Sequence, residues 1–253
     1  MLRPSEVDLH IHTRYCPCAK EEMRVEAVVK TALKRGLKVI GFVPHSYPIA
    51  EHGPGKLGIY EMVREEVRKS EPGPTVFVGA EVDCIDSSGK LLAGREIARK
   101  VDYILAAPDH YHLSFVKGPP EEKRAFLDYH HRTIMNLLDD PLVSAIAHPY
   151  SSLLDVLPDL WEVAEEYFLE EAQKAKEKGK AMEVNGSLFL TKGHPEDSLR
   201  AYERLMGILA GQGTMLLLGS DAHSLDSVGK VPSFIFEKLG IPESQIWLPK
   251  NLS

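Results

Sequence analysis

The hexapeptide Val7-Asp8-Leu9-His10-Ile11-His12 alternates apolar residues with two histidines near the start of the chain. Its apolar character is typical of a strand buried on both faces, and two histidines spaced two residues apart would point to the same side. Similar apolar runs recur along the sequence at residues 39–43, 75–80, 103–107, 143–147, 181–184 and 215–218. We therefore predict seven β-strands, most of them buried in a parallel sheet.

Amphipathic segments lie between several of these runs and predict helices. The first has apolar side chains at nearly helical spacing, and Gly36 follows it as a C-cap. The predicted helices span residues 22–35, 121–138, 160–178 and 197–209. Strands that alternate with helices predict an α/β fold with a parallel sheet, either open or closed into a barrel. The chain shows no internal repeat and no low-complexity linker, so residues 1–253 are predicted to form a single domain.

The composition argues against several classes of protein. The 253 residues include 43% hydrophobic and 26% charged residues, which is ordinary for a globular protein. A formal net charge of -7 argues against a nucleic-acid-binding surface. Three cysteines do not form a disulfide framework, and the N-terminus lacks a signal-peptide pattern. No apolar run approaches the roughly 18 residues that span a membrane. We therefore expect a cytoplasmic protein without a membrane partner.

Residue types that bind metal ions gather directly after the predicted strands. In parallel α/β folds the carboxyl ends of the strands form the active face, so these side chains are expected to meet. They follow six of the strands and comprise His10, His12, His45, Glu81, His110, His148, Asp221 and His223. Imidazoles and carboxylates together suit zinc, manganese or iron, and Glu81 has two oxygens with which to bridge two ions. The sequence therefore predicts a metal-dependent hydrolase.

Five of these segments resemble the motifs of the PHP family, named for polymerase and histidinol phosphatase. The similar segments are Asp8-Leu9-His10-Ile11-His12-Thr13, Pro44-His45-Ser46, Gly79-Ala80-Glu81, Ala147-His148-Pro149 and Gly219-Ser220-Asp221-Ala222-His223. The resemblance implies a distorted seven-stranded, TIM-like (β/α) barrel that holds two or three divalent ions and hydrolyses phosphate esters. It also implies that a hydroxide bridging the ions attacks phosphorus while the ions neutralise the phosphate oxygens.

The resemblance further implies which residues hold each ion. The implied sets are His10, His12, Glu81 and Asp221 for the first ion, Glu81, His110 and His148 for the second, and His45, His223 and one residue of the loop after His12 for the third. The leaving alkoxide needs a proton or a metal contact. Asp221 and His223 are the predicted catalytic residues for supplying that proton.

The loop after His12 departs from the family pattern. Cys18, in Cys16-Pro17-Cys18-Ala19, stands where members similar to histidinol phosphatase carry a histidine. A thiolate binds zinc well, so Cys18 is predicted to be the remaining ligand of the third ion. The alternative is a small buried cysteine with no metal role, in which case Glu21 or Glu22 would complete the site or the third ion would be absent.

Two other motifs also differ from the family pattern. The usual Thr-Asp-His of the second motif is here Val43-Pro44-His45. In the fourth motif, Asp109 takes the usual place of the histidine. Assigning the ligand to His110 therefore requires a shift of one residue, and Asp109 and His112 remain alternative ligands.

The predicted substrate is a small phosphorylated metabolite, with histidinol phosphate as one candidate. Arg14, Lys117 and Lys192 lie in loops near the expected active face and are predicted to bind the phosphate. An amidohydrolase-type enzyme is an alternative, but that class would usually carry a carboxylated lysine at a mid-barrel strand end, whereas this chain has Glu81 after its third strand. A regulatory, catalytically impaired member of the family is a second alternative, which the altered Cys18 favours and the nearly complete set of ligand types disfavours.

Overall fold

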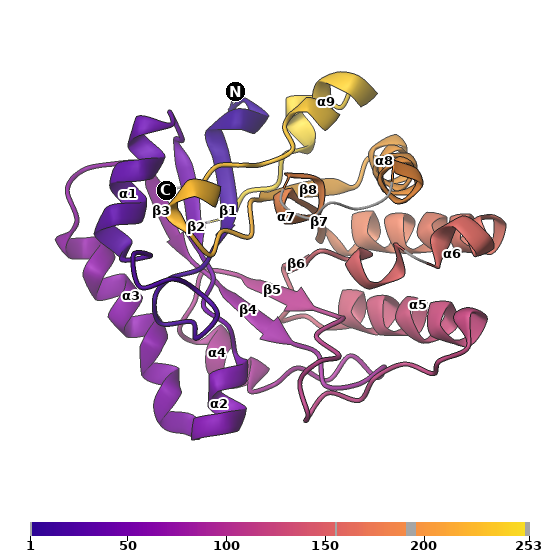
Figure 1. The fold of residues 1–253 in the computed structure, drawn as a ribbon, viewed down its shortest axis with the longest axis horizontal. Coiled ribbons are helices and arrows are strands. Elements are labelled where there is room, and N and C mark those ends of the chain that lie inside the picture. The colour runs from indigo at the N-terminus through magenta and orange to yellow at the C-terminus, as the bar shows by residue number, and fades with distance from the viewer. Residues whose placement is uncertain (1, 155, 191–195, 251–253) are drawn as a thin grey trace.

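Parallel β-strands form the centre of the protein (Figure 1). The computed structural model describes residues 2–154, 156–190 and 196–250. Within these ranges the strands are β1 (Val7–Ile11), β2 (Val39–Phe42), β3 (Thr75–Val78), β4 (Ala80–Asp83), β5 (Ile104–Ala107), β6 (Ala145–Ile146), β7 (Ala181–Asn185) and β8 (Met215–Gly219). Every pairing between these strands is parallel, which confirms the predicted α/β class.

The described strands form two sheets, and their number differs from the seven strands predicted. One sheet has the order β1-β2-β3 and the other the order β4-β5-β6-β7-β8. The additional strand arises because the predicted strand over residues 75–80 is divided at Gly79. The ring of Tyr103 packs so closely on Gly79 that a Cβ atom there would lie 2.6 Å from Tyr103 Cζ. The Tyr103 hydroxyl also donates a hydrogen bond to the carbonyl oxygen of Leu9 at 2.6 Å, so this side chain fills the joint between the two sheets.

Isolated parallel bridges connect the two sheets beside the predicted ligands. Ile11 in β1 pairs with Ala222, which follows β8, and His45, which follows β2, pairs with Glu81 in β4. The amide of Ser46 donates a hydrogen bond to the carbonyl oxygen of Glu81 at 2.9 Å. These contacts draw together the ends of β1, β2, β4 and β8, where many of the predicted ligands lie.

Helices surround the sheets (Figure 1). Those beside the three-stranded sheet are α1 (Val25–Lys34) and α3 (Gly58–Lys69), and those beside the five-stranded sheet are α5 (Lys123–Asp139), α6 (Leu157–Lys178) and α8 (Glu196–Gly211). The shorter helices are α2 (Tyr47–His52), α4 (Gly94–Ala98), α7 (Gly186–Leu190) and α9 (Phe234–Leu239). Short 3-10 helices span Pro4–Glu6, Pro54–Leu57, Ser151–Leu153, Leu225–Ser227 and Glu243–Gln245.

The helices α1, α5, α6 and α8 confirm the four predicted helices, with ends that differ by a few residues. By contrast, α2 and α3 occupy a segment for which no helix was predicted. In α3 only Tyr60 and Val63 are buried, so its apolar face is narrow and its sequence is mostly polar. In the described part of the chain, no helix has the length and apolar character needed to cross a lipid bilayer.

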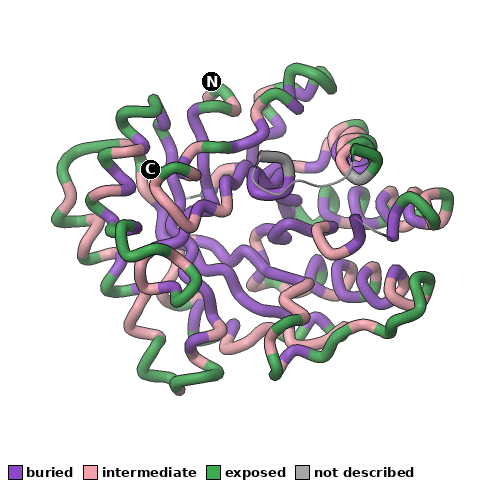
Figure 2. Tube along the Cα trace, viewed as in Figure 1, coloured by how far each residue is buried: buried purple, intermediate pink, exposed green. Residues whose placement is uncertain are grey.

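The strands are buried because helices cover the sheets on the outside and side chains fill the interior. Every residue of β1 and of β7 is buried. Figure 2 shows the same distribution, with buried residues along the strands and exposed residues on the outer surfaces of the helices. One charged side chain, Glu183, stands in the middle of β7 and is completely buried. A buried carboxylate requires hydrogen-bonding or charged partners, and those of Glu183 belong to the predicted ligand cluster.

Candidate metal centre

Glu81 lies at the centre of the cluster, and its buried carboxylate faces imidazole rings from several segments. Its two oxygens lie between 2.9 and 3.4 Å from one ring nitrogen each of His10, His12, His45, His110 and His148. Oε2 faces the first three rings, and Oε1 faces the last two. The strand β4 therefore presents one carboxylate to two groups of nitrogen atoms, which is the arrangement expected of a ligand shared by two cations.

His10 and His12 leave β1 on the same side, as their spacing predicted. Their Nε2 atoms lie 3.0 Å apart. The same two atoms lie 3.4 and 3.1 Å from Oδ1 of Asp221. Asp221 follows β8, so the contact between the ends of β1 and β8 brings together residues that are about 200 positions apart in sequence. Three atoms with lone pairs thus converge on one point.

The segment after β5 offers three alternative ligands, and the structure places them differently. His110 directs Nε2 toward the central carboxylate, while its Nδ1 lies 2.7 Å from Oδ1 of Asp83. Asp109 lies behind His148, with its Oδ1 3.0 Å from Nδ1 of that ring. His112 is exposed, and its ring centroid lies 5.5 Å from that of His110. His110 therefore has the position of a direct ligand, whereas Asp109 supports a neighbouring ligand.

The structure brings Cys18 together with His45 and His223 in a pocket of about 380 Å³. Cys18 is exposed, so the alternative of a small buried cysteine is wrong. Hydrogen bonding with Cys16, followed by contacts with His223 and His45, lowers the pKa of the Cys18 thiol. A cysteine sulfur beside two imidazoles is a donor set suited to zinc. Cys16, by contrast, is buried, with its sulfur 3.5 Å from Nδ1 of His12.

The two carboxylates considered as substitutes for Cys18 have partners elsewhere. Glu21 lies within ion-pair distance of Arg14 and Arg24, at 3.7 and 3.9 Å. Glu22 accepts a hydrogen bond from the amide of Leu225 at 3.1 Å. Neither side chain lines the pocket that contains Cys18.

Two acidic residues that support the imidazoles from behind were not predicted. Oε1 of Glu183 lies 2.7 Å from Nδ1 of His10, and Oδ1 of Asp83 lies 2.7 Å from Nδ1 of His110. Carboxylates in such positions fix the tautomer and the orientation of a metal-binding imidazole. A signal for Glu183 was present in the sequence, because it is a charged residue between the apolar Met182 and Val184 of a predicted strand, where burial requires a partner. Asp83 lay beyond the predicted strand over residues 75–80 and had no such signal.

The charges of the cluster stabilise one another in the absence of a cation. Burial raises the pKa of Glu81, but the charges of His45 and His10 outweigh it and hold that pKa well below its usual range. For His45 the directions are reversed: burial lowers the pKa of the imidazole, but the Glu81 charge and the Cys18 thiol outweigh it and raise that pKa to about 10. His12 behaves differently, since burial and the neighbouring charge of His45 lower its pKa to about 3. The cluster therefore holds protons on some imidazoles that a metal ion would displace.

Two of the candidate ligands occupy the left-handed region of backbone conformation. His148 has a φ of 27° and Asp221 a φ of 54°. Among the described non-glycine residues, only Ala93 shares a positive φ. Such conformations cost about 1–3 kcal/mol each and are found preferentially at functional sites, where the surrounding structure holds them.

The donor atoms of the cluster fit a site for divalent cations. Glu81 Oε2 and His45 Nδ1 are buried 3.0 Å apart, and within the described structure neither has a hydrogen-bond partner. Four sets of residues bring their donor atoms within 4.8 Å of one another, namely His12, His45 and His223; His10, His12 and Asp221; His45, Glu81 and His110; and Asp109, His110 and His148. Imidazole and carboxylate donors of this kind match zinc, manganese or iron.

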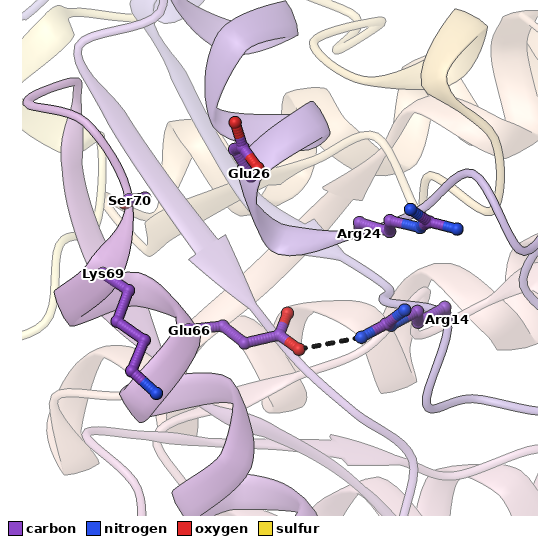
Figure 3. A pocket seen from close by; sticks show the side chains of 6 residues that line it. All are labelled: Arg14, Arg24, Glu26, Glu66, Lys69 and Ser70. Carbon is purple, nitrogen blue, oxygen red and sulfur yellow. Dashed lines mark hydrogen bonds and ion pairs between the residues drawn. The ribbon is translucent and has the colours of Figure 1, made fainter.

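Two of the residues predicted to bind phosphate, Arg14 and Lys117, do not line this pocket. Arg14 lines a separate pocket of about 230 Å³ beside α1 and α3 (Figure 3). Its Nη2 atom lies 3.0 Å from Oε1 of Glu66, which also accepts a hydrogen bond from the Tyr15 hydroxyl. Lys117 is exposed and does not line the pocket of the histidine cluster, and Lys192 lies outside the described residues.

Comparison with known families and sequences identifies relatives along most of the chain. The family model of the PHP domain matches residues 8–187. A protein of Acetivibrio thermocellus named "Probable phosphatase" is 28% identical over 228 residues, which cover 88% of this chain and 82% of that protein. A protein of Clostridium novyi with the same description is 27% identical over 246 residues, which cover 97% of this chain and 88% of its relative.

A solved structure has a similar fold. The histidinol phosphate phosphatase of Lactococcus lactis, complexed with zinc, L-histidinol and phosphate, aligns with a TM-score of 0.64. The alignment covers 94% of this chain and 95% of that chain, with 16% sequence identity. At this identity the similarity establishes the fold alone.

Proposed function

The chain belongs to the PHP domain family, and we propose that it is a metal-dependent phosphoesterase that acts on a small phosphorylated metabolite. The observation that carries this proposal is the position of Glu81, whose two oxygens face five imidazole nitrogens at 2.9–3.4 Å. A shared carboxylate of this kind suits adjacent divalent cations, and adjacent cations are well suited to phosphate-ester hydrolysis. The name given to the related sequences, "Probable phosphatase", supports the same reaction class.

The proposed centre holds two or three ions of zinc, manganese or iron. The sets of residues that would hold them are His10, His12, Glu81 and Asp221; Glu81, His110 and His148; and Cys18, His45 and His223. Bound divalent cations would supply a nucleophile from water at neutral pH and would neutralise charge on the phosphate oxygens. The protein contributes the donor atoms, their spacing around Glu81, and the acidic residues that orient the rings from behind.

The leaving oxygen of the substrate requires a proton, and Asp221 and His223 are the two predicted donors. His223 is the better candidate, because the charge of His10 outweighs burial and holds the pKa of Asp221 below its usual range. Both side chains line the 380 Å³ pocket. His223 is 35% exposed and Asp221 17% exposed, so the imidazole is the more accessible of the two. Nδ1 of His223 donates a hydrogen bond to the backbone carbonyl of Asp221 at 2.9 Å, so Nε2 is the nitrogen left either to bind the third cation or, in a two-ion centre, to exchange a proton with a bound molecule.

The pocket suits a small substrate whose phosphate is bound by cations. Its described lining includes Tyr47, His112 and Leu113 around the cluster, and no lysine or arginine is among those lining residues. Within the described part of the chain, the bound ions rather than a basic side chain would therefore balance the charge of a phosphate group. Histidinol phosphate is one candidate, and the similar structure from Lactococcus lactis contains L-histidinol and phosphate.

The fold proposed for this enzyme is one domain over residues 1–253, in which the two sheets complete a distorted barrel. The bridges between Ile11 and Ala222 and between His45 and Glu81 support this arrangement, because they link the sheets on both sides of the cluster.

The function can be tested by measuring metal content and hydrolysis together. Protein prepared with zinc, manganese or iron should hold two or three ions per chain and should hydrolyse at least one member of a panel of phosphorylated metabolites that includes histidinol phosphate. His10→Ala and Asp221→Ala should each lower turnover by at least roughly 100-fold, because each removes a ligand of the charge-stabilising centre. His52→Ala, at an exposed histidine of α2, is a control that should retain activity.

Three results would contradict the proposal. Less than one ion per chain after addition of all three metals would exclude the metal centre. Wild-type turnover in both ligand variants, with unchanged metal content, would exclude their assigned role. Hydrolysis of C–N bonds without hydrolysis of phosphate esters would favour an amidohydrolase-type reaction instead.

A further inference from the structure

Glu183 is a buried acidic residue that belongs to none of the proposed ligand sets. It occupies the middle of β7, where its strand neighbours Met182 and Val184 are fully buried apolar residues. An isolated carboxylate in such a place would be strongly destabilising. Its presence there is therefore explained by the partners that its two oxygens contact.

Each oxygen of Glu183 contacts a different candidate ligand. Oε1 lies 2.7 Å from Nδ1 of His10. Oε2 accepts a hydrogen bond from the backbone amide of His148 at 2.5 Å and another from the side-chain amide of Asn185 at 3.2 Å. Nδ1 of His10 donates its hydrogen bond to Glu183. The lone pair of the ring is therefore on Nε2, where it can bind a cation held together with Glu81.

The contact to His148 is made at a strained point of the backbone. The φ of His148 is 27°, and the bond from its amide to Glu183 holds the chain in this conformation. The imidazole of His148 then reaches Oε1 of Glu81, while that of His10 reaches Oε2. The rings of His10 and His148 are nearly stacked, with centroids 6.2 Å apart. One carboxylate thus sets the relative position of ligands on both sides of Glu81.

The neighbouring strand leaves space for this contact. A Cβ atom on Gly219, at the end of β8, would lie 2.1 Å from Oε1 of Glu183 and 2.5 Å from Cβ of His10. Glycine at this position therefore lets the Glu183–His10 pair pack against the backbone of β8.

We propose that Glu183 is a positioning residue that orients His10 and His148 and so couples two of the cation positions. This inference rests on the proposed metal centre and adds to it a residue that does not itself bind metal or substrate. A positioning role differs from a purely structural one in its consequence. Substituting Glu183 should lower the affinity for metal by more than it lowers the stability of the metal-free protein.

The test compares metal binding in Glu183→Gln with that in the wild type. Glutamine keeps the volume of the side chain but replaces one acceptor oxygen by an NH2 group. Either the amide of His148 then loses its acceptor, or Nδ1 of His10 must accept from the NH2 group and its Nε2 must carry the proton, which removes the lone pair needed to bind a cation. We expect zinc affinity, measured by competition with a chromogenic chelator, to fall roughly 10- to 100-fold. The visible absorption spectrum of the cobalt-loaded variant should also differ from that of the wild type.

Glu171→Gln provides a matched control. Glu171 is also a buried carboxylate that joins two side chains, with oxygens 2.8 Å from Nδ1 of His131 and 2.7 Å from the Tyr150 hydroxyl, but it lies outside the cluster. If Glu183 had only a structural role, Glu183→Gln would have a lower Tm in both the metal-free and the metal-loaded protein, with unchanged zinc affinity. If Glu183 positions the ligands, zinc should raise the Tm of Glu183→Gln by less than it raises the Tm of Glu171→Gln.

The outcomes separate this inference from the proposed function. If the wild type binds zinc or cobalt and Glu183→Gln binds both with wild-type affinity and spectrum, the positioning role is wrong and the metal centre stands. Gly219→Ala, which crowds the same contact, replaces Glu183→Gln if that variant does not fold, and wild-type binding there has the same meaning. A wild-type protein that binds neither metal would overturn the metal centre and the positioning role together.

Discussion

Replacing Glu81 by glutamine would keep the size of the side chain while removing one negative charge from the centre of the histidine cluster. The carboxylate oxygens of Glu81 lie 2.9–3.4 Å from five imidazole nitrogens. Cations bound by these nitrogens would therefore lie within a few ångströms of the carboxylate. Because Oε1 and Oε2 face different groups of rings, the new NH2 group would point a hydrogen-bond donor at one of the proposed cation positions. We therefore expect both positions to be affected by a single change.

The size of the effect follows from the electrostatics. At an effective dielectric constant of about 20, a unit charge about 4 Å away contributes about 4 kcal/mol, and a divalent ion doubles this figure. The free energy of desolvating the carboxylate offsets much of that attraction. A net loss of only ~3 kcal/mol already corresponds to a loss of affinity of roughly 100-fold. Turnover should fall by at least a similar factor, since the same charges stabilise the transition state.

The measurement is elemental analysis after equilibration in zinc buffers, combined with a phosphatase assay on the best substrate of the metabolite panel. Glu81→Gln should lose more than one ion per chain at zinc concentrations that saturate the wild type. Glu171→Gln, which removes a buried carboxylate outside the cluster, should keep its full metal content. Unchanged stoichiometry and affinity in Glu81→Gln would refute the assignment of Glu81 as a shared ligand.

Three further outcomes are expected. Cys18→Ser should lose one ion per chain while Cys18→His retains it, and equal metal content in the wild type and the serine variant would favour a two-metal centre. Zinc binding at pH 7 should release more than one proton per chain, measured by calorimetry in buffers of different ionisation enthalpy, because neighbouring carboxylates outweigh burial, raising the pKa of His10 well above its usual value and that of His45 to about 10 in the metal-free protein. Hydrogen bonds from Lys38 and then from Arg3 lower the pKa of Glu6 to about 2, so Glu6 stabilises the fold above its unfolded pKa of about 4.5 and loses this effect as the pH falls toward 2. Glu6→Gln should accordingly lower the Tm at pH 7, with a difference from the wild type that disappears near pH 2, and a difference independent of pH would contradict this origin.

The fold class and the location of the candidate site could be predicted because both depend on local patterns. Continuous apolar runs identify strands that are covered on both faces, and the polar residue that ends each run identifies the edge at which those strands meet. The spacing of His10 and His12 places both rings on one side of a strand whatever the rest of the fold does. The structure accordingly brings together the histidines, Glu81 and Asp221 that were selected from the sequence.

The features that were not predicted depend on contacts between distant segments. The division at Gly79 follows from the ring of Tyr103, which lies directly before β5. Glu183 and Asp83 orient ligands that lie 173 and 27 positions away. Arg14 turns toward Glu66 on α3 rather than toward the cluster, because an ion pair at 3.0 Å is available there. A choice among alternative partners for one long side chain is decided by packing, which local spacing does not reveal.

The division of the strands into two sheets has a consequence for the way the protein unfolds. His10, His12 and His45 extend from the three-stranded sheet, whereas Glu81, His110, His148 and Asp221 extend from the five-stranded sheet. Cations bound as proposed would therefore act as cross-links across the boundary between the two halves of the molecule. Removing them with a chelator would loosen that boundary first, so amide hydrogens near Ile11 and Ala222 should exchange faster while those within each sheet remain protected.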